Sequence, residues 1–491
     1  MQSKAAKVFR LRLSNSSVFA RDVLKLVGGT TAAQAIGFLV VPLLARIYSP
    51  DAFGALSVFG SITTILIIVS CLRYEYAILL PEQEQDASNL LILCVGLAFL
   101  VSVVAAMIVT FCGGKIAAVL NVPDLAPVMW MIPVVVFAGG LLQALSQWSS
   151  RKRKYGRVSF AQASKAGCTS ISQLALGVGG THHLGGLVMG VVVGGLAASI
   201  GLAGQVWIAD RRSILSNFSI KVVNSVLRRY RKFPLFDIWG ALFNSVSWQL
   251  PVFMLAFFFS DTVVGNYGMA SRLVYFPMSL IGSSIGQVFY QRTSQLRARQ
   301  EPFTGVVESV LERMIALLMY PALLMTFMGK TIILVLLGPT WADAGSYVQI
   351  LGLWSFFWFI SSPLHTVFLV LERQQSLLVA QTVILVSRLL SLAVGGLLRD
   401  VQLALVLFSA SGVLVYGSLL IWICLLSGLQ IHRLWQGVRG YFLLSIPGVL
   451  LVSGAQRFLS VYTLLILGIG AVSVIVYYYV IFRKHRHLFK V

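Results

Sequence analysis

Charged residues are scarce in this 491-residue chain. They make up 11% of the sequence, with only 16 Asp and Glu, whereas about a quarter of the residues of a soluble domain are charged. Hydrophobic residues make up 58%. Apolar stretches of about 18 or more residues recur along nearly the whole chain, long enough as helices to cross a hydrocarbon core of roughly 30 Å. We therefore exclude a water-soluble domain and predict an all-α polytopic membrane protein.

Several features of enzymes and metalloproteins are also missing. The five cysteines lie in or at the ends of the apolar stretches, without the paired spacing of a zinc site or a disulfide framework. The adjacent His182 and His183 have no further ligands near them. A phosphate-binding loop of the GxxxxGK[ST] type is absent, and the longest expected outer loop, of about fifteen residues, is too short for a catalytic domain. We expect no metal, no cofactor and no ATP-driven step within the chain.

About fourteen transmembrane helices account for the apolar stretches. The expected spans are 24–47, 53–80, 88–112, 127–149, 158–179, 185–208, 235–260, 263–290, 307–328, 344–371, 376–398, 401–426, 440–456 and 462–482. The last pair is the least regular, because the short span 440–456 is interrupted by Pro447.

The basic residues show the orientation. The net charge of +22 would suit nucleic acid if the cations shared one water-exposed surface, but they are spread over alternate loops. Most lie at 4–25, 151–157, 209–232, 291–299 and 483–487, which fall on one side of the membrane. Short cytoplasmic loops are enriched in Lys and Arg, so both termini are predicted to be cytoplasmic. The N-terminal stretch lacks the apolar core and cleavage site of a signal peptide.

The chain shows signs of an internal duplication. Leu44, Ala45, Ser49 and Gly54 recur 211 positions later as Leu255, Ala256, Ser260 and Gly265, and Thr110, Phe111, Gly114 and Lys115 are echoed by Thr326, Phe327, Gly329 and Lys330. A repeat of six spans keeps both copies in the same orientation, which predicts two parallel lobes with a substrate site between them.

This repeat defines the expected domains. They are an N-terminal lobe at 1–208, a basic cytoplasmic linker at 209–234, a C-terminal lobe at 235–426, and two additional helices with a basic tail at 427–491. In the linker, apolar residues recur at helical spacing among basic ones, which is compatible with an amphipathic helix on the inner leaflet or with a plain polar linker.

Ionisable residues inside the spans are the candidates for function, because burying them in lipid is costly. Arg272 lies eleven residues after Asp261, about 16 Å deep at 1.5 Å per residue. Arg388 lies at a similar depth in span 376–398. Both are candidates to line a substrate cavity, a structural ion pair being the alternative.

Four further residues are candidates. Arg73 lies about 12 Å inside the end of span 53–80, where an arginine could still reach the interface, and Lys165 lies at similar depth in span 158–179. Glu75 is two positions from Arg73, hence on a nearly opposite side of the helix, so we expect that the two cannot pair with each other directly. Asp237, at the start of span 235–260, could pair with a cavity arginine or take up a proton.

The chain resembles the lipid-linked oligosaccharide flippases of the polysaccharide transporter family, within the multidrug/oligosaccharidyl-lipid/polysaccharide exporter superfamily. The likeness extends from about residue 20 to 425. It rests on LLARIYSPDAFGALSVF (43–59), LRYEYAILLPEQEQDA (72–87), RYRKFPLF (229–236), the run from 257 to 290, LGPTWADAGSYVQIL (337–351) and SSPLHTVFLVLERQ (361–374).

The resemblance implies two six-helix lobes around a cationic cavity that opens alternately to either leaflet of a bacterial inner membrane. The implied substrate is a polyprenyl-diphosphate-linked glycan, and Arg73 and Arg272 stand in the matching segments that would hold it. Membrane lipids, a polysaccharide polymerase and glycosyltransferases are the implied partners. Glu75 and Asp237 are the candidates for coupling to an ion gradient.

Two alternatives stay open at this point. A multidrug exporter of the same superfamily handles mostly cationic compounds and needs acidic cavity residues, whereas the deep ionisable residues here are mostly arginine. A polysaccharide polymerase or ligase would also be multispanning and basic, but such enzymes usually carry a long outer loop.

Overall fold

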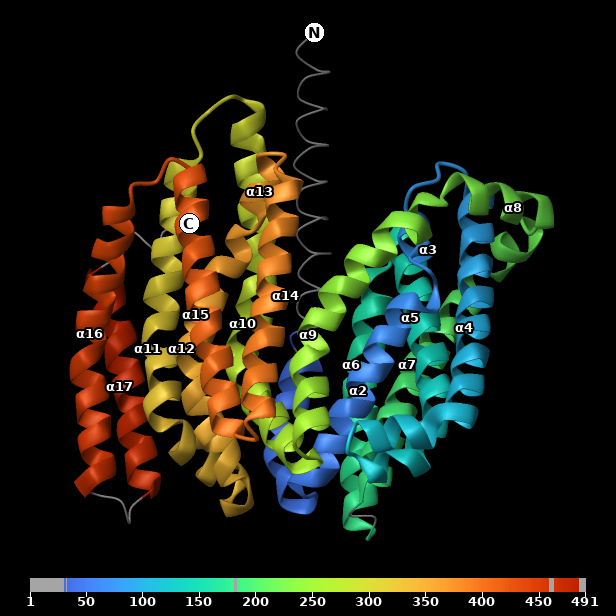
Figure 1. Ribbon diagram of the computed structural model, residues 1–491. Coiled ribbons are helices and arrows are strands. Elements are labelled where there is room, and N and C mark those ends of the chain that lie inside the picture. Colours follow the sequence, from blue (N-terminus) through green and yellow to red (C-terminus); the bar gives the residue numbers. More distant parts are fainter. Residues whose placement is uncertain (1–30, 32, 181–182, 459–462, 485–491) are drawn as a thin grey trace. The chain divides into compact units, whose positions relative to one another are not determined.

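A computed structural model describes residues 31, 33–180, 183–458 and 463–484, and these residues form helices and turns without a β-strand. The chain divides into two compact units, Met1–Gln249 and Leu250–Val491. The division falls within one helix, and the expected lobe boundaries at residues 208 and 235 stay predictions. Each unit is described below by itself (Figure 1).

The first unit begins with a helix at Ala33–Ile47. It continues with α2 (Pro50–Ser70), α3 (Tyr74–Ala77), α4 (Glu84–Val119), η1 (Pro123–Met131), α5 (Ile132–Arg151), α6 (Tyr155–Val178), α7 (Leu184–Ser216), α8 (Ile220–Arg229), η2 (Phe233–Asp237) and the first half of α9 (Ile238–Phe258).

The second unit contains the end of α9. It continues with α10 (Asp261–Ala298), α11 (Thr304–Leu337), η3 (Pro339–Trp341), α12 (Ala342–Leu364), α13 (Thr366–Val370), α14 (Gln374–Leu397), α15 (Val401–Leu426), α16 (Ile431–Phe458) and α17 (Thr463–Lys484).

The expected membrane spans coincide with helices of the structure. Within the described residues, eleven helical segments are long and apolar enough to cross a membrane, and a shorter apolar helix covers Ala33–Ile47. The expected spans 158–179 and 263–290 correspond to α6 and α10, which are helical but less apolar. The first span was expected from residue 24, and its beginning lies outside the described residues. The expectation of a multi-pass all-α membrane protein is confirmed.

The repeated residues occupy equivalent local positions in the two units. Ser49 caps the N-terminus of α2 and Ser260 that of α10, each accepting a 3.4 Å hydrogen bond from the backbone N–H three residues later. Thr110 and Thr326 each donate to the carbonyl oxygen four residues earlier, at 2.8 and 2.9 Å. These equivalences favour the predicted duplication.

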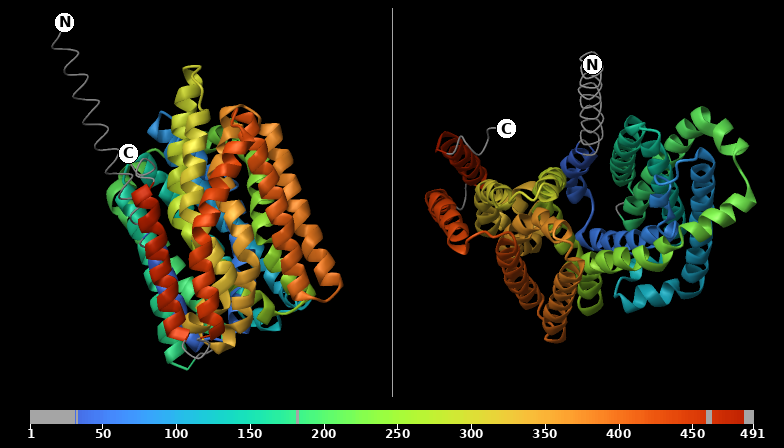
Figure 2. Two further views of the ribbon diagram at one scale, coloured as in Figure 1. Left: turned by 90° about the vertical axis from the view of Figure 1, so that its left-hand side faces the viewer. Right: turned by 90° about the horizontal axis from the view of Figure 1, so that it is seen from above.

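The helices α16 and α17, for which the sequence offers no repeat partner, pack on α11. Figure 2 shows the pair in red at one edge of the second unit. Pro321 lies inside α11, and because proline has no N–H it leaves the Leu317 carbonyl without its helical donor. The Tyr478 hydroxyl of α17 donates to that carbonyl oxygen at 2.7 Å, and the Tyr477 hydroxyl donates to Ala316 O at 3.0 Å. Helix α17 thus satisfies the backbone carbonyl that the proline frees in α11.

The Tyr478→Phe substitution tests this contact. Loss of the hydroxyl leaves the Leu317 carbonyl unsatisfied, and we expect the free energy of unfolding to fall by about 1–3 kcal/mol. Tyr479→Phe is the matched control, since the Tyr479 side chain is 62% exposed. The loss should shrink in a Pro321→Ala background, where the restored N–H binds the carbonyl. An equal loss in both backgrounds, measured by thermal unfolding in detergent, would show that the hydroxyl serves another purpose.

Candidate functional site

The expected span 53–80 is interrupted in the structure. Helix α2 ends at Ser70, and a turn precedes the single-turn helix α3. Leu72 and Arg73 in this turn have φ angles of 49° and 66°. Side chains other than glycine rarely adopt this left-handed conformation, which costs about 1–3 kcal/mol for each residue. Since the segment has no Gly or Pro that would favour a break, tertiary contacts must hold it.

Those contacts come from the surrounding helices of the first unit. Cys71, Tyr74, Ala77 and Ile78 belong to one buried cluster, together with residues of α4, α5, α7 and α8. The Tyr74 hydroxyl donates to the carbonyl oxygen of Leu227 in α8 at 2.9 Å. Burial on all sides therefore fixes the interrupted conformation.

The turn brings Arg73 together with two acidic residues and a tyrosine. Its Nε donates to Asp237 Oδ2 at 2.7 Å, and its Nη1 lies 3.8 Å from Glu75 Oε1. The guanidinium carbon lies 4.2 Å from the centre of the Tyr76 ring, in cation–π contact. We call Arg73, Glu75, Tyr76 and Asp237 the Arg73 cluster. The expectation that Arg73 and Glu75 cannot meet is wrong, because it assumed a continuous helix.

Within this cluster Glu75 is the most deeply buried group. Its side chain is 1% exposed, and neither carboxylate oxygen accepts a hydrogen bond from the described residues. It lies between the end of the α2 span and the start of the α4 span. Burial raises the pKa of Glu75 to about 7, although the Arg73 guanidinium acts in the opposite direction.

The cluster contains two carboxylates and one guanidinium. Asp237, whose side chain is 49% exposed, makes the shorter contact with Arg73 and is the better solvated of the two. If Glu75 were ionised in addition to Asp237, one buried negative charge would have no cation of its own. Such a charge destabilises the folded protein strongly. The geometry therefore favours an ionised Asp237–Arg73 pair beside a protonated Glu75.

Lys165 lies on α6 at its closest approach to α7. A Cβ atom at Gly194 of α7 would lie 2.6 Å from the Lys165 carbonyl oxygen, so only glycine allows the two helices to come this near. The Lys165 side chain is partly buried, and the described residues provide it with no ion pair. It lies outside the Arg73 cluster.

The remaining two candidates belong to the second unit. Arg272 is exposed on α10, while its neighbours Ala270, Ser271 and Val274 are buried. Arg272 therefore lies on a different face of α10 from these three residues. An exposed arginine in a helix that corresponds to an expected membrane span is suited to contact a solute.

Arg388 has a different environment. Its side chain is 5% exposed, and Nη2 donates to the Tyr416 hydroxyl at 3.0 Å, which joins α14 to α15. Tyr267 and Tyr275 of α10 are close enough to interact with it electrostatically. In this conformation the contacts favour a role in holding helices together, and its proposed role in substrate binding stays a prediction.

Tyr275, which interacts electrostatically with Arg388, belongs to an aromatic cluster that the sequence did not indicate. The Trp354 ring stacks on Trp358 at 5.7 Å, and Tyr275 meets both rings edge-on. Gly412 of α15 leaves room for the Trp354 ring, which any Cβ at that position would strike. Helix spacing alone does not distinguish such a cluster from ordinary core aromatics.

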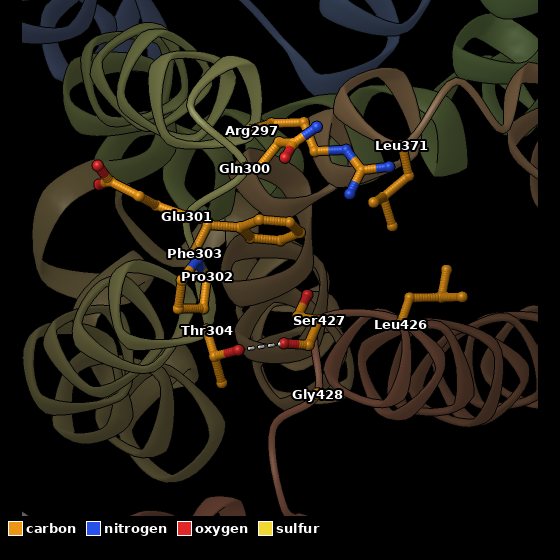
Figure 3. A pocket seen from close by; sticks show the side chains of 10 residues that line it. All are labelled: Arg297, Gln300, Glu301, Pro302, Phe303, Thr304, Leu371, Leu426, Ser427 and Gly428. Atoms are coloured by element: carbon orange, nitrogen blue, oxygen red, sulfur yellow. Dashed lines mark hydrogen bonds between the residues drawn. The ribbon is translucent and has the colours of Figure 1, made fainter.

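A pocket of about 730 Å³ opens at one end of the second unit, among the ends of α10, α11, α13 and α15 (Figure 3). It is lined by Arg297, Gln300, Glu301, Pro302, Phe303, Thr304, Leu371, Leu426, Ser427 and Gly428. Figure 3 shows the Arg297 guanidinium pointing toward Leu371, whereas the Glu301 carboxylate points away. None of the candidate residues lines this pocket.

Comparison with known proteins identifies the family. The family described as "Polysaccharide biosynthesis protein" matches residues 43–346, more than half of the chain. The chain belongs to this family. The matched region includes the whole Arg73 cluster and Arg272.

Similar proteins within and beyond this family are transporters. The succinoglycan biosynthesis transport protein ExoT of Rhizobium meliloti (strain 1021) is 22% identical over 348 residues, which cover 69% of the chain and 66% of that protein, slightly less than two thirds of its length. The lipid II flippase MurJ in its inward closed conformation matches with a TM-score of 0.72 at 13% identity, over 94% of the chain and 99% of MurJ.

A multidrug resistance transporter of the MATE family in its inward-facing conformation also matches. Its TM-score is 0.63 at 10% identity, over 82% of the chain and 94% of that protein. At these identities the likeness to both solved structures establishes the fold alone. The chain therefore belongs by its sequence to the polysaccharide biosynthesis family, and its fold is similar to those of the two solved structures.

The Glu75→Gln substitution tests the protonated state of Glu75. The folded protein has the raised pKa, so it retains a proton that the unfolded chain releases above its ordinary pKa near 4.5. The stability contributed by this proton is present below that value and is lost as the pH rises through about 7. We expect the wild-type melting temperature to fall over this window, and the Glu75→Gln variant to lose that dependence.

Glu82→Gln is the matched control, because Glu82 is exposed and has no ion pair among the described residues. It should retain the wild-type pH profile. A Glu75→Gln profile parallel to that of wild type would mean that Glu75 is ionised throughout the window.

Proposed function

We propose that the chain is a flippase that moves a polyprenyl-diphosphate-linked oligosaccharide from the cytoplasmic to the outer leaflet of the bacterial inner membrane, for synthesis of a surface polysaccharide. Membership of the polysaccharide biosynthesis family supports the pathway, and the fold shared with a lipid II flippase supports the mode of action. The observation that carries the proposal is that Arg272, eleven residues after the start of α10, is exposed.

Arginine suits the chemistry of this substrate. Its planar guanidinium binds two phosphate oxygens at once, and unlike lysine it stays charged when partly desolvated. Arg272 is an exposed residue in this conformation. Arg73 is engaged by Asp237 at 2.7 Å, so a diphosphate that binds Arg73 must displace this carboxylate or share the guanidinium with it. Lys165 and Arg388 are the other cations proposed for the substrate path.

Translocation proceeds by alternating access in this proposal. Two lobes related by duplication would expose the cationic residues first to the cytoplasmic side, where both termini lie, and then to the outer side. No bond of the substrate is made or broken. Glycosyltransferases supply the lipid-linked oligosaccharide and a polymerase uses it after transfer.

A proton is the coupling ion that the Arg73 cluster accommodates best. The Glu75 carboxyl is buried beside Cys71, Tyr74 and Cys94, and accepts no hydrogen bond from the described residues. The carbonyls of Val69, Cys71, Arg73 and Glu75 at the helix break already accept backbone hydrogen bonds. A sodium ion needs several oxygen ligands, whereas a proton needs only the carboxylate itself.

A multidrug exporter is the second candidate, and the likeness to a MATE transporter favours it. Such a protein needs acidic residues to bind cationic compounds. In the Arg73 cluster, Asp237 is already paired with the Arg73 guanidinium, and the Glu75 side chain is buried. A polymerase or ligase has less support, since the similar proteins are transporters and flippases.

The Arg272→Glu substitution tests the substrate class. A carboxylate at this position repels a diphosphate, so we expect export of the surface glycan to be lost while the protein level in the membrane stays normal. Lipid extraction should then find the lipid-linked repeat unit on the cytoplasmic leaflet, as in cells that lack the gene.

Arg399→Glu is the control, because Arg399 is exposed in the turn between α14 and α15 and lies outside the proposed path. It should export normally. Normal glycan output from a stably expressed Arg272→Glu protein would overturn the role of Arg272, and accumulation on the outer leaflet would indicate a polymerase.

A further inference from the structure

The segment 211–236 lies at one end of the first unit and comprises the end of α7, helix α8 and the start of η2. Figure 1 shows α8 lying across the end of α4 rather than continuing along the bundle, and α8 packs on α4. We call the exposed part of this segment the 211–236 surface.

One side of the segment is fixed to the core. Val226 and Tyr230 belong to the buried cluster around the α2–α3 break. The Asn89 side chain of α4 donates to Asn217 O at 2.7 Å and accepts from the Ser219 backbone N–H at 3.0 Å. The segment is therefore a folded part of the unit with a defined inner and outer side, which favours the amphipathic helix over the plain polar linker.

The outer side combines apolar and basic residues. Large apolar side chains are exposed at Leu215, Phe218, Ile220, Leu227, Leu235 and Phe236. Basic side chains are exposed at Arg211, Arg212, Lys221, Arg228, Arg231 and Lys232. A surface that only faced water would not present so many large apolar groups together.

The acidic residues near this surface are occupied by other partners. Asp210 accepts from Arg157 at 3.2 Å and from the Trp148 indole at 3.1 Å. Asp237 pairs with Arg73, and Asp86 pairs with Arg229 at 3.5 Å. Within the described part of the chain, Arg229 is paired in this way, whereas the six exposed basic residues named above form no ion pair. Their positive charges are therefore available to bind a partner outside the protein.

We propose that the 211–236 surface docks on the membrane by binding anionic phospholipid headgroups. Apolar side chains at this level of a membrane protein enter the boundary between headgroups and acyl chains, while adjacent Lys and Arg contact the lipid phosphates. A soluble acidic partner would satisfy the cations but would leave no role for the exposed Phe218, Ile220 and Phe236. This inference does not depend on the proposed transport function.

Hydrogen exchange of the full-length protein in lipid nanodiscs tests the proposal. The α8 amides should exchange several-fold more slowly in phosphatidylcholine containing phosphatidylglycerol than in phosphatidylcholine alone. High salt should abolish the difference, because ions screen the attraction between exposed charges. The combined Lys221→Gln, Arg228→Gln and Arg231→Gln variant should lose the difference as well.

The matched control neutralises Lys115, Lys330 and Arg399, three exposed cations predicted to lie on the other side of the membrane. It should keep the wild-type response. Equal exchange of wild-type α8 in both lipids would overturn the proposal. Slower exchange caused only by a small fraction of polyprenyl phosphate in phosphatidylcholine would also overturn it, and would instead identify a landing site for the transported lipid.

Discussion

A polar group that leaves water for the hydrocarbon region has to find its partner inside the protein, because lipid offers none. This constraint explains contacts that are far apart in the chain. The carbonyl freed by Pro321 receives the Tyr478 hydroxyl from a helix more than 150 residues later. The Arg388 guanidinium of α14 is bound by Tyr416 of α15, and Arg73 is bound by Asp237. Each contact also joins two helices, so satisfying polar groups and assembling the bundle are one process.

Glu75 is the exception to this pattern. Its buried carboxylate has only a distant contact with Arg73, at 3.8 Å, and it follows two residues held in left-handed backbone conformations. Strain and an unsatisfied polar group both reduce stability, and their coincidence at one turn is typical of a site maintained for function. A proton on Glu75 relieves the electrostatic cost in this conformation. Its release would favour a rearrangement in which Glu75 competes with Asp237 for Arg73.

Hydropathy predicted where helices lie, because the length of apolar sequence needed to cross a membrane is set by the bilayer. It did not predict the break between α2 and α3, since Cys71 to Ala77 contains no Gly or Pro and the turn is held by Tyr74 and its contacts with α8. The same break made Arg73 and Glu75 neighbours. Depth along the helix made Arg388 a candidate to line a cavity, but spacing within one helix could not show its tyrosine partner, which lies on the next helix. The sequence indicated that Asp237 could pair with an arginine, but it did not indicate which arginine.

Movement of the lipid-linked oligosaccharide by the purified protein is the central claim. The direct measurement uses vesicles that contain the protein and a polyprenyl-diphosphate-linked oligosaccharide placed in one leaflet, and follows its appearance in the other by accessibility to a glycan-modifying enzyme. The wild-type protein should transfer the lipid much faster than protein-free vesicles or vesicles with the Arg272→Glu protein. Equal transfer rates in all three would contradict the account.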